Sequence, residues 1–260
     1  MTIHAPAHWS CVDFISDMHL QESEPATFAA WRDYMRSTSA QAVFILGDLF
    51  EVWLGDDALV NGSVFERQCV DILCEAASRL AVFIMQGNRD FLMGHRMMEA
   101  CGATLLDDPT LLVFADQSWL LTHGDALCLD DHAYQAFRAT VRTAEWQQDF
   151  LSKPFSERQT LARGMRQTSE LRKHQGEAYA DVDADAALEW MARHGAATMV
   201  HGHTHRPGEH ALGANQRRIV LSDWDLSAEP ARAEVLRLQR TADVGAQILR
   251  RSPTDCCKPG

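Results

Sequence analysis

The stretch VFILGDLFEVW, residues 43–53, predicts a buried strand that ends at a candidate active-site residue. Its first four residues are all apolar, and a short apolar run of this kind is typical of a strand that is buried on both faces of a sheet. The run ends in Gly47 and Asp48, so a carboxylate lies at the carboxyl-terminal tip of the strand. Open α/β sheets place their binding sites at such tips.

Four other apolar runs end in the same way, each in a cluster that contains Asp, Asn or His. The runs cover residues 12–16, 81–86, 119–122 and 197–200, and the clusters span residues 17–19, 87–90, 123–125 and 201–205. Because parallel strands bring their carboxyl ends to one edge of a sheet, we expect all five clusters to converge at one edge of a single open α/β sheet. The sequence therefore predicts a metal site at that edge.

The candidate ligands combine hard oxygen donors with imidazole nitrogens. They are Asp17, His19, Asp48, Asn88, His123, His203 and His205. No cysteine lies at a strand tip, which favours a catalytic site for Mn²⁺, Fe²⁺ or Zn²⁺ over a structural zinc site. Seven ligands are too many for one ion in an open site, but two ions that share Asp48 use all of them. Such ions lie roughly 3.5–4 Å apart and hold a hydroxide for in-line attack at phosphorus.

The motif order D-x-H, GD, GN, H-G-D and G-H-T-H resembles that of the calcineurin-like metallophosphoesterases, over residues 12–240. The longer phrases FISDMHL, LGDLFEVWLGDD, QGNRDFLMG, THGDALCLDD and VHGHTHRP resemble one branch of that superfamily, the UDP-2,3-diacylglucosamine diphosphatases of lipid A biosynthesis. The resemblance implies two facing β-sheets flanked by helices, two divalent ions, Mn²⁺ by family precedent, and a lipid-linked nucleotide substrate. It also implies a product pair, UMP and 2,3-diacylglucosamine 1-phosphate, formed by attack at the uridine-side phosphorus.

The resemblance also assigns the ligands to two ions. One ion is expected to take Asp17, His19, Asp48 and His205, and the other is expected to take Asp48, Asn88, His123 and His203. A hydrogen-bonded histidine or a turn aspartate would explain any single member of the set, but not the set as a whole. His201, Asp90 and Asp125 lie in the same clusters and are expected to orient ligands or to cap turns.

Arg89 follows Asn88, where the wider superfamily commonly has a histidine that can protonate a leaving alkoxide. An arginine stays protonated and cannot act as a general acid, but it can pair with phosphate oxygens. The substrate should therefore have a good leaving group, and a diphosphate has one. We assign catalytic roles to Asp48 and Arg89.

Residues 131–178 differ in composition from the rest of the chain and are predicted to be an inserted helical lid. Residues 131–176 carry eight Lys or Arg against five acids, whereas the whole chain has a net charge of −12. Apolar residues at helical spacing predict two amphipathic helices around Lys153 and Pro154. A helical hairpin with a solvated basic face is the simpler interpretation. A lipid diphosphate, however, needs an apolar groove and cations, and a basic lid would also favour peripheral contact with the anionic inner-membrane surface.

The expected substrate contacts come from the resemblance and from position. They are Asn88, Arg89, Asp131, Arg166, Ser169, Lys173 and His203, together with Trp53, which could equally be a core residue. The lid sequence MRQTSELRKHQGE matches the family at Arg166 and Ser169 and then departs from it, and Lys173 could fill one of the altered positions.

The remaining expectations concern the elements around the site. Helices are predicted over residues 25–36, 64–79 and 93–100. Residues 111–114 and 119–122 are predicted to form a hairpin-like pair, and residues 219–222 and 233–238 are predicted to be late strands of a second sheet. The phosphoesterase domain should span residues 10–240, and residues 241–260 should form a C-terminal extension with a partly disordered tail, RSPTDCCKPG.

The protein is expected to be cytoplasmic and monomeric, and its peripheral contact with the membrane is expected from the lid. No apolar run approaches the ~18–20 residues of a membrane span, and the first residues do not resemble a signal peptide. Seven scattered cysteines do not suggest a disulfide framework, and five of them, Cys11, Cys69, Cys74, Cys101 and Cys128, are expected to be buried thiols. The acidic net charge disfavours nucleic-acid binding.

Two alternatives stay open at this point. The chain could be a phosphodiesterase or nucleotide-sugar diphosphatase with a soluble substrate. It could also be a non-catalytic interaction module on a phosphoesterase fold, although the intact ligand set argues against that.

Overall fold

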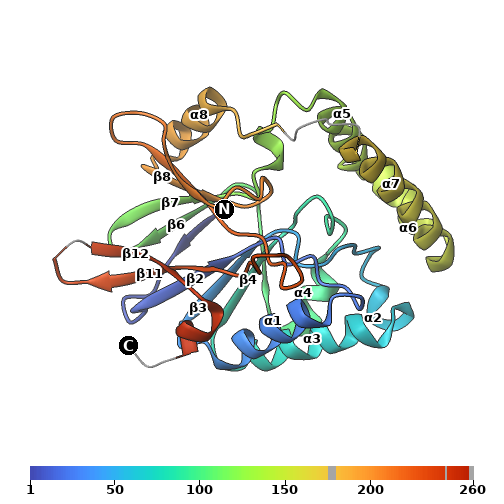
Figure 1. Ribbon diagram of the computed structural model, residues 1–260, viewed down its shortest axis with the longest axis horizontal. Helices are drawn as coiled ribbons and strands as arrows, with labels where there is room; N and C mark the ends of the chain where they lie inside the picture. The colour runs from blue at the N-terminus through green and yellow to red at the C-terminus, as the bar shows by residue number, and fades with distance from the viewer. Residues whose placement is uncertain (175–179, 244, 258–260) are drawn as a thin grey trace.

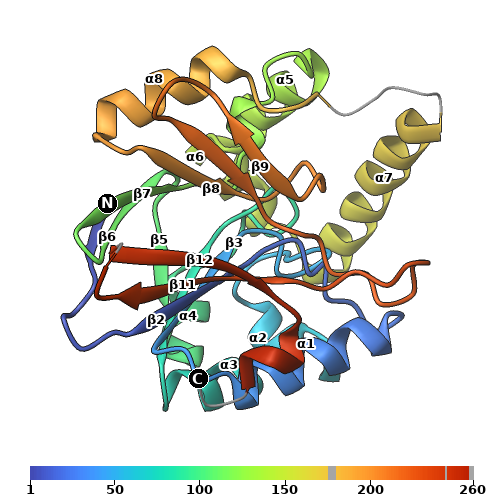
Figure 2. The same cartoon turned by 60° about the vertical axis from the view of Figure 1, so that its left-hand side comes forward.

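The computed structural model describes the backbone of residues 1–174, 180–243 and 245–257. The side chains of these residues are described as well, except for those of 166–174. Within this part of the chain, two mixed six-stranded sheets pack face to face and helices cover both outer surfaces (Figure 1, Figure 2). The predicted α/β sandwich is confirmed.

The sheets have the strand orders β12-β11-β2-β3-β4-β5 and β1-β6-β7-β8-β10-β9. The strands of the first sheet are β2 (Cys11–Ile15), β3 (Ala42–Leu46), β4 (Ala81–Met85), β5 (Thr104–Leu106), β11 (Val235–Thr241) and β12 (Gly245–Arg251). The strands of the second sheet are β1 (Thr2–His4), β6 (Thr110–Phe114), β7 (Gln117–Leu121), β8 (Thr198–His201), β9 (Gly208–Ala211) and β10 (Arg217–Val220). Strands β2 to β5 run parallel to one another, as do β7, β8 and β10.

Strand β3 shows why an all-apolar run forms the centre of this fold. Successive side chains of a strand point to opposite faces. Phe44 lies in the core between the two sheets, where it stacks on Phe83 at 4.6 Å between ring centroids, whereas Val43 and Ile45 lie in the core between the first sheet and its helices. Both faces of β3 are therefore buried, as the run predicts.

Helices cover the outer surfaces of the sandwich. On the first sheet they are α1 (Pro25–Ser37), α2 (Ala58–Asn61), α3 (Val64–Ala77) and α4 (His95–Cys101), and on the second sheet the covering helix is α8 (Ala184–His194). The three helices predicted for residues 25–36, 64–79 and 93–100 are confirmed as α1, α3 and α4. Strands β6 and β7 form the predicted hairpin, in which Ala115 and Asp116 both have positive φ.

The five strands with polar tips belong to two sheets and not to one, so the prediction of a single converging edge is wrong. Strands β2, β3 and β4 lie in the first sheet, and β7 and β8 lie in the second. The late strands are also divided, because β10 pairs with β8 and β11 pairs with β2. An apolar run identifies a buried strand but carries no information on its partner. Convergence arises because the carboxyl ends of the two sheets face each other.

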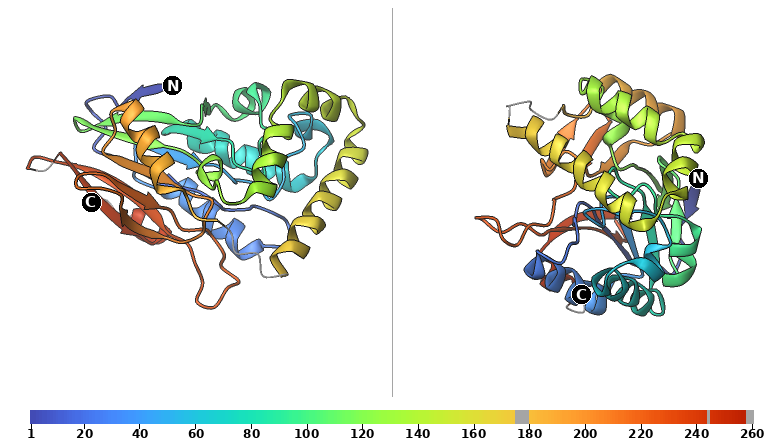
Figure 3. Two further views of the ribbon diagram at one scale, coloured as in Figure 1. Left: turned by 90° about the horizontal axis from the view of Figure 1, so that it is seen from above. Right: turned by 90° about the vertical axis from the view of Figure 1, so that its right-hand side faces the viewer.

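The described part of the predicted lid, residues 131–174, contains three helices and not the predicted two. They are α5 (His132–Val141), α6 (Ala144–Ser152) and α7 (Phe155–His174), and we call them the inserted helices. The unpredicted break lies at Arg142 and Thr143, where the Thr143 hydroxyl accepts a hydrogen bond from the Trp146 N–H and begins α6. Figure 3 shows the inserted helices at one end of the sandwich.

The ends of the chain belong to the sandwich. Strand β1 extends the second sheet beside β6, and β12 pairs with β11 along its full length. A 3-10 turn, η2 (Pro253–Cys257), follows β12 and buries Cys256. The prediction of a disordered tail is therefore wrong up to residue 257. Cys74 is exposed, contrary to prediction, and all seven cysteines are free thiols.

A buried ion pair ties the C-terminal turn to the rest of the first sheet. Asp13, in the middle of β2, accepts hydrogen bonds from Arg237 Nε at 2.7 Å and from Nη2 at 2.8 Å. The same carboxylate accepts from the hydroxyls of Tyr34 and Thr38, both at 2.9 Å. Arg237 Nη2 also donates to the carbonyl of Cys256 at 3.2 Å. One buried carboxylate thus connects β2, α1, β11 and η2.

Replacing this carboxylate should destabilise the protein strongly. We expect Asp13→Ala to lower the free energy of unfolding by about 3–5 kcal/mol, because it leaves the Arg237 charge buried without its partner. Urea denaturation followed by circular dichroism measures the change. Asp33→Ala is the matched control: Asp33 is exposed on α1, and its surface pair with Arg32 should contribute less than about 1 kcal/mol. Equal losses in the two variants would contradict the prediction.

Candidate metal centre and the adjoining cavity

The seven predicted ligands come together where the carboxyl ends of the two sheets meet. Asp17 and His19 follow β2, Asp48 follows β3, Asn88 follows β4, His123 follows β7, and His203 and His205 follow β8. Their side chains form two groups of close donor atoms. In each of two sets, Asp17, His19 and His205, and Asp17, Asp48 and His123, one ligand atom per residue lies within 4.8 Å of the others.

The distances within the two groups suit two ions. His205 Nε2 lies 3.4 Å from both His19 Nε2 and Asp17 Oδ1. On the other side, Asn88 Oδ1 lies 3.0 Å from His123 Nε2 and 2.8 Å from His203 Nδ1. Metal ligands around a single ion approach one another at such distances.

Asp48 lies between the two groups. One carboxylate oxygen, Oδ2, is 3.8 Å from His19 Nε2, and the other, Oδ1, is 3.8 Å from His123 Nε2. Asp48 is therefore the residue that both groups would share if two ions were bound. Asp17 also reaches both groups, which the sequence does not indicate.

The backbone at the ligands is unusual. Five of the seven ligands, Asp17, His19, Asp48, His203 and His205, have positive φ values between 46° and 64°. Non-glycine residues seldom adopt this left-handed conformation, and clusters of them mark functional sites.

Two glycines of the motifs leave space for ligand carboxylates. A Cβ atom on Gly87 would overlap Asp48 Oδ1, and a Cβ atom on Gly202 would overlap Asp17 Oδ2. The glycines of the GN and GHTH motifs are therefore needed so that the ends of different strands can approach closely.

The neighbouring residues of the motifs hold the ligands in place. Buried Asp90 accepts hydrogen bonds from the backbone N–H groups of Gly87 at 2.8 Å and Leu49 at 2.8 Å, so it fixes the turns that carry Asn88 and Asp48. Buried His201 lies within hydrogen-bond distance of the Gly202 carbonyl through Nδ1, at 2.9 Å, and of Arg218 Nη1 through Nε2, at 3.3 Å. These contacts agree with the orienting roles expected for both residues.

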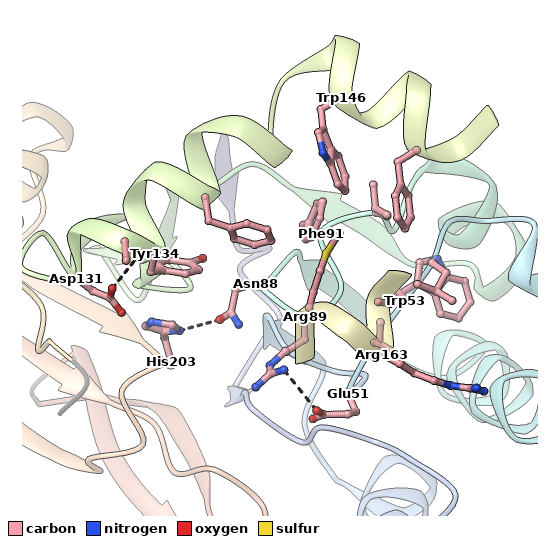
Figure 4. A pocket seen from close by; sticks show the side chains of 18 of the residues that line it. Glu51, Trp53, Asn88, Arg89, Phe91, Asp131, Tyr134, Trp146, Arg163 and His203 are labelled. Atoms are coloured by element: carbon pink, nitrogen blue, oxygen red, sulfur yellow. Dashed lines mark hydrogen bonds and ion pairs between the residues drawn. The ribbon is translucent and has the colours of Figure 1, made fainter. Parts of the chain in front are cut away.

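Glu51 belongs to the centre but was missed by the sequence analysis. Its Oε2 lies 3.2 Å from His19 Nδ1, and its Oε1 lies 3.5 Å from Arg89 Nη1 (Figure 4). A carboxylate beside Nδ1 favours a proton on that nitrogen, which leaves Nε2 free to face a metal ion. Glu51 is the last residue of the GDLFE phrase, three residues after Asp48. An acidic residue just after a strand tip is common, so its position alone did not indicate a role.

The charges of the centre fit divalent cations. Burial lowers the pKa of His123, but the carboxylates of Asp48 and Asp17 outweigh burial and raise the pKa to about 9. The pKa of His203 is lowered to about 4, first by burial and then by the charge of His123. The negative electrostatic potential that keeps a proton on buried His123 also attracts a metal cation. A bound cation would displace that proton, because it binds the neutral imidazole. The donor types, their spacing and this potential all fit a site for two ions.

A cavity of about 1200 Å³ opens from the metal centre towards the inserted helices. At the metal end its walls are polar and include Asn88, Arg89, Asp131, Tyr134 and His203 (Figure 4). Farther along, the walls are mainly apolar and include Leu54, Phe91, Phe137, Trp146, Phe150 and Phe155. We call this space the large cavity. It could accommodate a molecule that is polar at one end and apolar at the other.

Five of the predicted substrate contacts line the large cavity, and three lie outside the described side chains. Those in the walls are Trp53, Asn88, Arg89, Asp131 and His203. Trp53 is also a core residue, because it is buried, packs on Phe50 at 4.8 Å between ring centroids and donates its indole N–H to Asp56. The remaining three, outside the described side chains, are Arg166, Ser169 and Lys173.

Four of the five basic residues of the insertion whose side chains are described make contacts within the protein, and the fifth, Arg163, is exposed beside the large cavity. Arg138 pairs with buried Asp125 at 2.8 Å, and Lys153 pairs with Asp149. Arg142 donates to the Gly87 carbonyl at 3.0 Å, and buried Arg158 pairs with Asp57. Two of these contacts fasten α5 and the α5–α6 junction to the strand-end turns of the metal centre. None of the described helices is long and apolar enough to cross a membrane.

Comparison with known proteins agrees with this site. Residues 12–207 match the sequence model of the family described as calcineurin-like phosphoesterase. A UDP-2,3-diacylglucosamine hydrolase of Chromobacterium violaceum is 44% identical over 222 residues, which cover 82% of this chain and 90% of that protein. Proteins of the same name from Chromohalobacter salexigens and Marinobacter nauticus are each 40% identical, and the alignments cover 88% of this chain and 93% and 98% of those proteins.

The chain therefore belongs to the calcineurin-like phosphoesterase family and, within it, to the family of the UDP-2,3-diacylglucosamine hydrolases. It is a metal-dependent hydrolase. Among solved structures, a dimetal phosphatase from Danio rerio aligns with a TM-score of 0.47 and 14% identity, over 92% of this chain and 98% of that one.

A methyl group at Gly87 should disrupt the metal centre, because its Cβ would overlap both Oδ1 and the backbone nitrogen of Asp48. We expect Gly87→Ala to displace Asp48 and to weaken metal binding by roughly 10- to 100-fold, the usual range when a ligand loses its support. Competition with a chelator, followed by mass spectrometry of bound metal, measures the change.

Gly164→Ala is the matched control for this substitution. Gly164 lies in α7, and a Cβ there would meet no atom within 4 Å. This variant should keep its metal affinity and gain up to about 1 kcal/mol in stability, since alanine is the better helix former. Unchanged metal affinity in Gly87→Ala would contradict the steric argument.

Proposed function

We propose that this chain hydrolyses the diphosphate bond of UDP-2,3-diacylglucosamine and releases UMP and 2,3-diacylglucosamine 1-phosphate. The observation that carries the proposal is the cavity that leads from the metal centre into aromatic walls. A substrate with a diphosphate next to a diacylated sugar has this same sequence of polar and apolar parts. The names of the similar proteins support the same substrate.

The metal ions would be held by the seven ligands in the two groups described above. We propose Mn²⁺ as the native metal, following the family. When bound, two such ions polarise the phosphoryl oxygens and supply the activated water for in-line attack, for which we propose the uridine-side phosphorus. Asp48 contributes by fixing the spacing between the two ligand groups.

Arg89 is proposed to stabilise the charge that develops on the diphosphate. Its backbone N–H donates to Asp48 Oδ1 at 2.8 Å, and its guanidinium faces Glu51, so the side chain is held beside the metal centre. A fixed cation at that point pairs with phosphate oxygens without donating a proton. Because the leaving group of a diphosphate is a stable phosphate ester, no general acid is required.

The other substrate contacts follow the walls of the large cavity. We propose that Asn88 and His203 contact the phosphates as well as a metal ion and that Asp131 contacts the sugar. Trp53 is proposed to lie against the acyl region. From the family pattern we keep Arg166, Ser169 and Lys173 as proposed contacts.

The acyl chains are proposed to lie among the aromatic side chains of the inserted helices. Trp146 stacks on Phe150 at 4.8 Å between ring centroids and also packs beside Phe91 at 6.0 Å, which forms a continuous apolar wall. Burial of alkyl chains there is favourable by roughly 25 cal/mol per Å² of apolar surface.

We further propose a monomer that stays in the cytoplasm, associates peripherally with the inner membrane and does not bind nucleic acid. Support for membrane contact comes from exposed apolar residues of the inserted helices, Leu151, Leu161 and Met165, beside a cavity suited to lipid. Exposed apolar side chains near a lipid site favour insertion into the membrane interface. The net charge of −12 disfavours nucleic acid.

The test of function is ³¹P NMR of UDP-2,3-diacylglucosamine with metal-stripped protein, with and without Mn²⁺, in ¹⁸O water. We expect Mn²⁺-dependent formation of UMP that carries the label, because attack at the uridine-side phosphorus places the new oxygen on UMP. Label in the lipid product would contradict the proposed site of attack. Equal hydrolysis of soluble UDP-sugars would favour the alternative of a soluble substrate.

The same assay at saturating substrate tests Arg89. We expect Arg89→Ala to lower kcat by at least roughly 100-fold, in the range found when one electrostatic stabiliser of a transition state is removed. Arg96→Ala is the control, because Arg96 is an exposed arginine of α4 outside the cavity. Full activity of Arg89→Ala would exclude the proposed role.

Membrane association is tested by sedimentation with vesicles of phosphatidylglycerol and phosphatidylethanolamine. We expect the protein to co-sediment at low salt, and we expect Leu151→Ser/Leu161→Ser to reduce the bound fraction several-fold, because two apolar contacts with the interface are lost. Val60→Ser is the control, an exposed valine of α2 outside the inserted helices. A protein that remains in the supernatant under all conditions would contradict the proposal.

A further inference from the structure

A second cavity, of about 470 Å³, opens from the metal centre away from the aromatic walls. It shares Glu51, Asn88, Arg89 and His203 with the large cavity, so the two spaces meet at the metal ligands. Its outer walls come from the segment between β2 and α1 and from the loop between β10 and β11. We call this space the small cavity.

We propose that the small cavity binds the uridine end of the substrate. This inference rests on the proposed function. It assigns a binding place to the nucleoside, the half of the substrate that the large cavity does not accommodate. A diphosphate positioned over the metal centre projects its two substituents in different directions. The apolar walls attract the acylated sugar, so the nucleoside is directed to the other opening.

The residues that line the small cavity suit an uncharged group with several hydrogen-bond donors. Apart from the metal ligands and the residues shared with the large cavity, its charged residues are Glu24, Asp223, Asp225 and Arg232. Arg232 is already paired with Asp223 at 2.8 Å and with Asp225 at 3.2 Å. The described walls therefore carry an excess of acceptors, which disfavours a further phosphate but suits hydroxyl and imide donors such as those of ribose and uracil.

Two polar side chains of the first wall are available to a ligand. Gln21 and Glu24 line the small cavity, and neither side chain has a hydrogen-bond partner among the described residues. Glu24 precedes α1, yet its carboxylate makes no capping hydrogen bond. An amide can both donate to and accept from the edge of uracil, and a carboxylate can accept from the two ribose hydroxyls.

The second wall is held rigid. Asp225 and Arg232 exchange two backbone hydrogen bonds of 2.8 and 2.9 Å, which close the loop between them. Asp225 Oδ1 also accepts from the backbone N–H groups of Ser227 at 3.1 Å and Ala228 at 2.9 Å. The Leu226 N–H donates to Thr27 Oγ1 of α1, which joins the two walls. A site whose walls are fixed before binding loses less conformational entropy when a ligand enters.

Direct binding of UMP to the Mn²⁺-loaded protein, measured by isothermal titration calorimetry, tests the assignment. We expect Gln21→Ala and Glu24→Ala each to raise the dissociation constant roughly 3- to 10-fold, as the loss of one or two hydrogen bonds predicts. The analogue 2′,3′-dideoxy-UMP should bind the wild-type protein more weakly than UMP does. It should bind Glu24→Ala as well as UMP does, because the partner of the hydroxyls is already absent.

Two control variants separate this site from general effects. Glu22→Ala removes an acid from the same segment, but Glu22 is exposed and does not line the cavity, so UMP affinity should not fall. Phe150→Ala alters a wall of the large cavity that does not line the small cavity, and it should leave UMP affinity unchanged. Wild-type affinity in Gln21→Ala and Glu24→Ala would overturn the assignment, and so would a loss of UMP binding in Phe150→Ala or in Glu22→Ala.

The same preparations distinguish failure of this inference from failure of the proposed function. If the wild-type protein hydrolyses UDP-2,3-diacylglucosamine but the small-cavity variants bind UMP normally, only the location of the nucleoside is wrong. If the wild-type protein does not hydrolyse that lipid, the proposed function is wrong, and the inference fails with it.

Discussion

The constraint on which the rest of the structure depends is the crowding of carboxylates and imidazoles at the meeting edges of two sheets. Buried acids repel one another, and five of the seven ligands are held with a strained left-handed backbone. The fold offsets these costs locally, with glycines that make room for Asp48 and Asp17, with Asp90 fixing two of the turns, and with Glu51 beside His19. Bound cations would remove most of the remaining repulsion, because they replace acid–acid contacts with acid–metal contacts. The metal centre and the sandwich are therefore one structural unit.

The inserted helices are attached to this unit through its own motifs. Asp125, two residues after His123, accepts hydrogen bonds from the Tyr134 hydroxyl and from Arg138 Nε, both on α5. Arg142, after α5, donates to Gln86 and Gly87, just before Asn88. The polar end of the large cavity is thereby fixed relative to the ligands, whereas its apolar end depends on packing among aromatic side chains. These contacts use Arg138 and Arg142, two of the five basic residues of the insertion whose side chains are described.

The candidate ligands and most helices could be predicted, because they depend on local patterns in the sequence. Features that depend on contacts between distant segments of the chain could not be predicted. A polar cluster after an apolar run identifies a strand tip without any knowledge of neighbouring strands, so seven candidate ligands could be named, and the structure brings their side chains together. Sheet membership depends on pairing between distant segments, so the two sheets were read as one edge. Asp13 within the apolar run of β2 indicates a buried acid that requires a buried partner, but its partner, Arg237, is distant in sequence and is identified only by the structure. Thr143 was a usable signal for the start of α6.

Glu51 and Arg89 connect the large cavity, the small cavity and the candidate metal centre. Both line the large and the small cavity, and Glu51 contacts the ligand His19 on one oxygen and Arg89 on the other. A change in the position of Arg89 must therefore alter the environment of His19, and the reverse must also hold, because a single carboxylate is shared. A substrate that extends across both cavities has to pass this pair at its diphosphate. In the proposed binding mode, Glu51 thus links the residues beside the diphosphate to the candidate ligand group that contains His19.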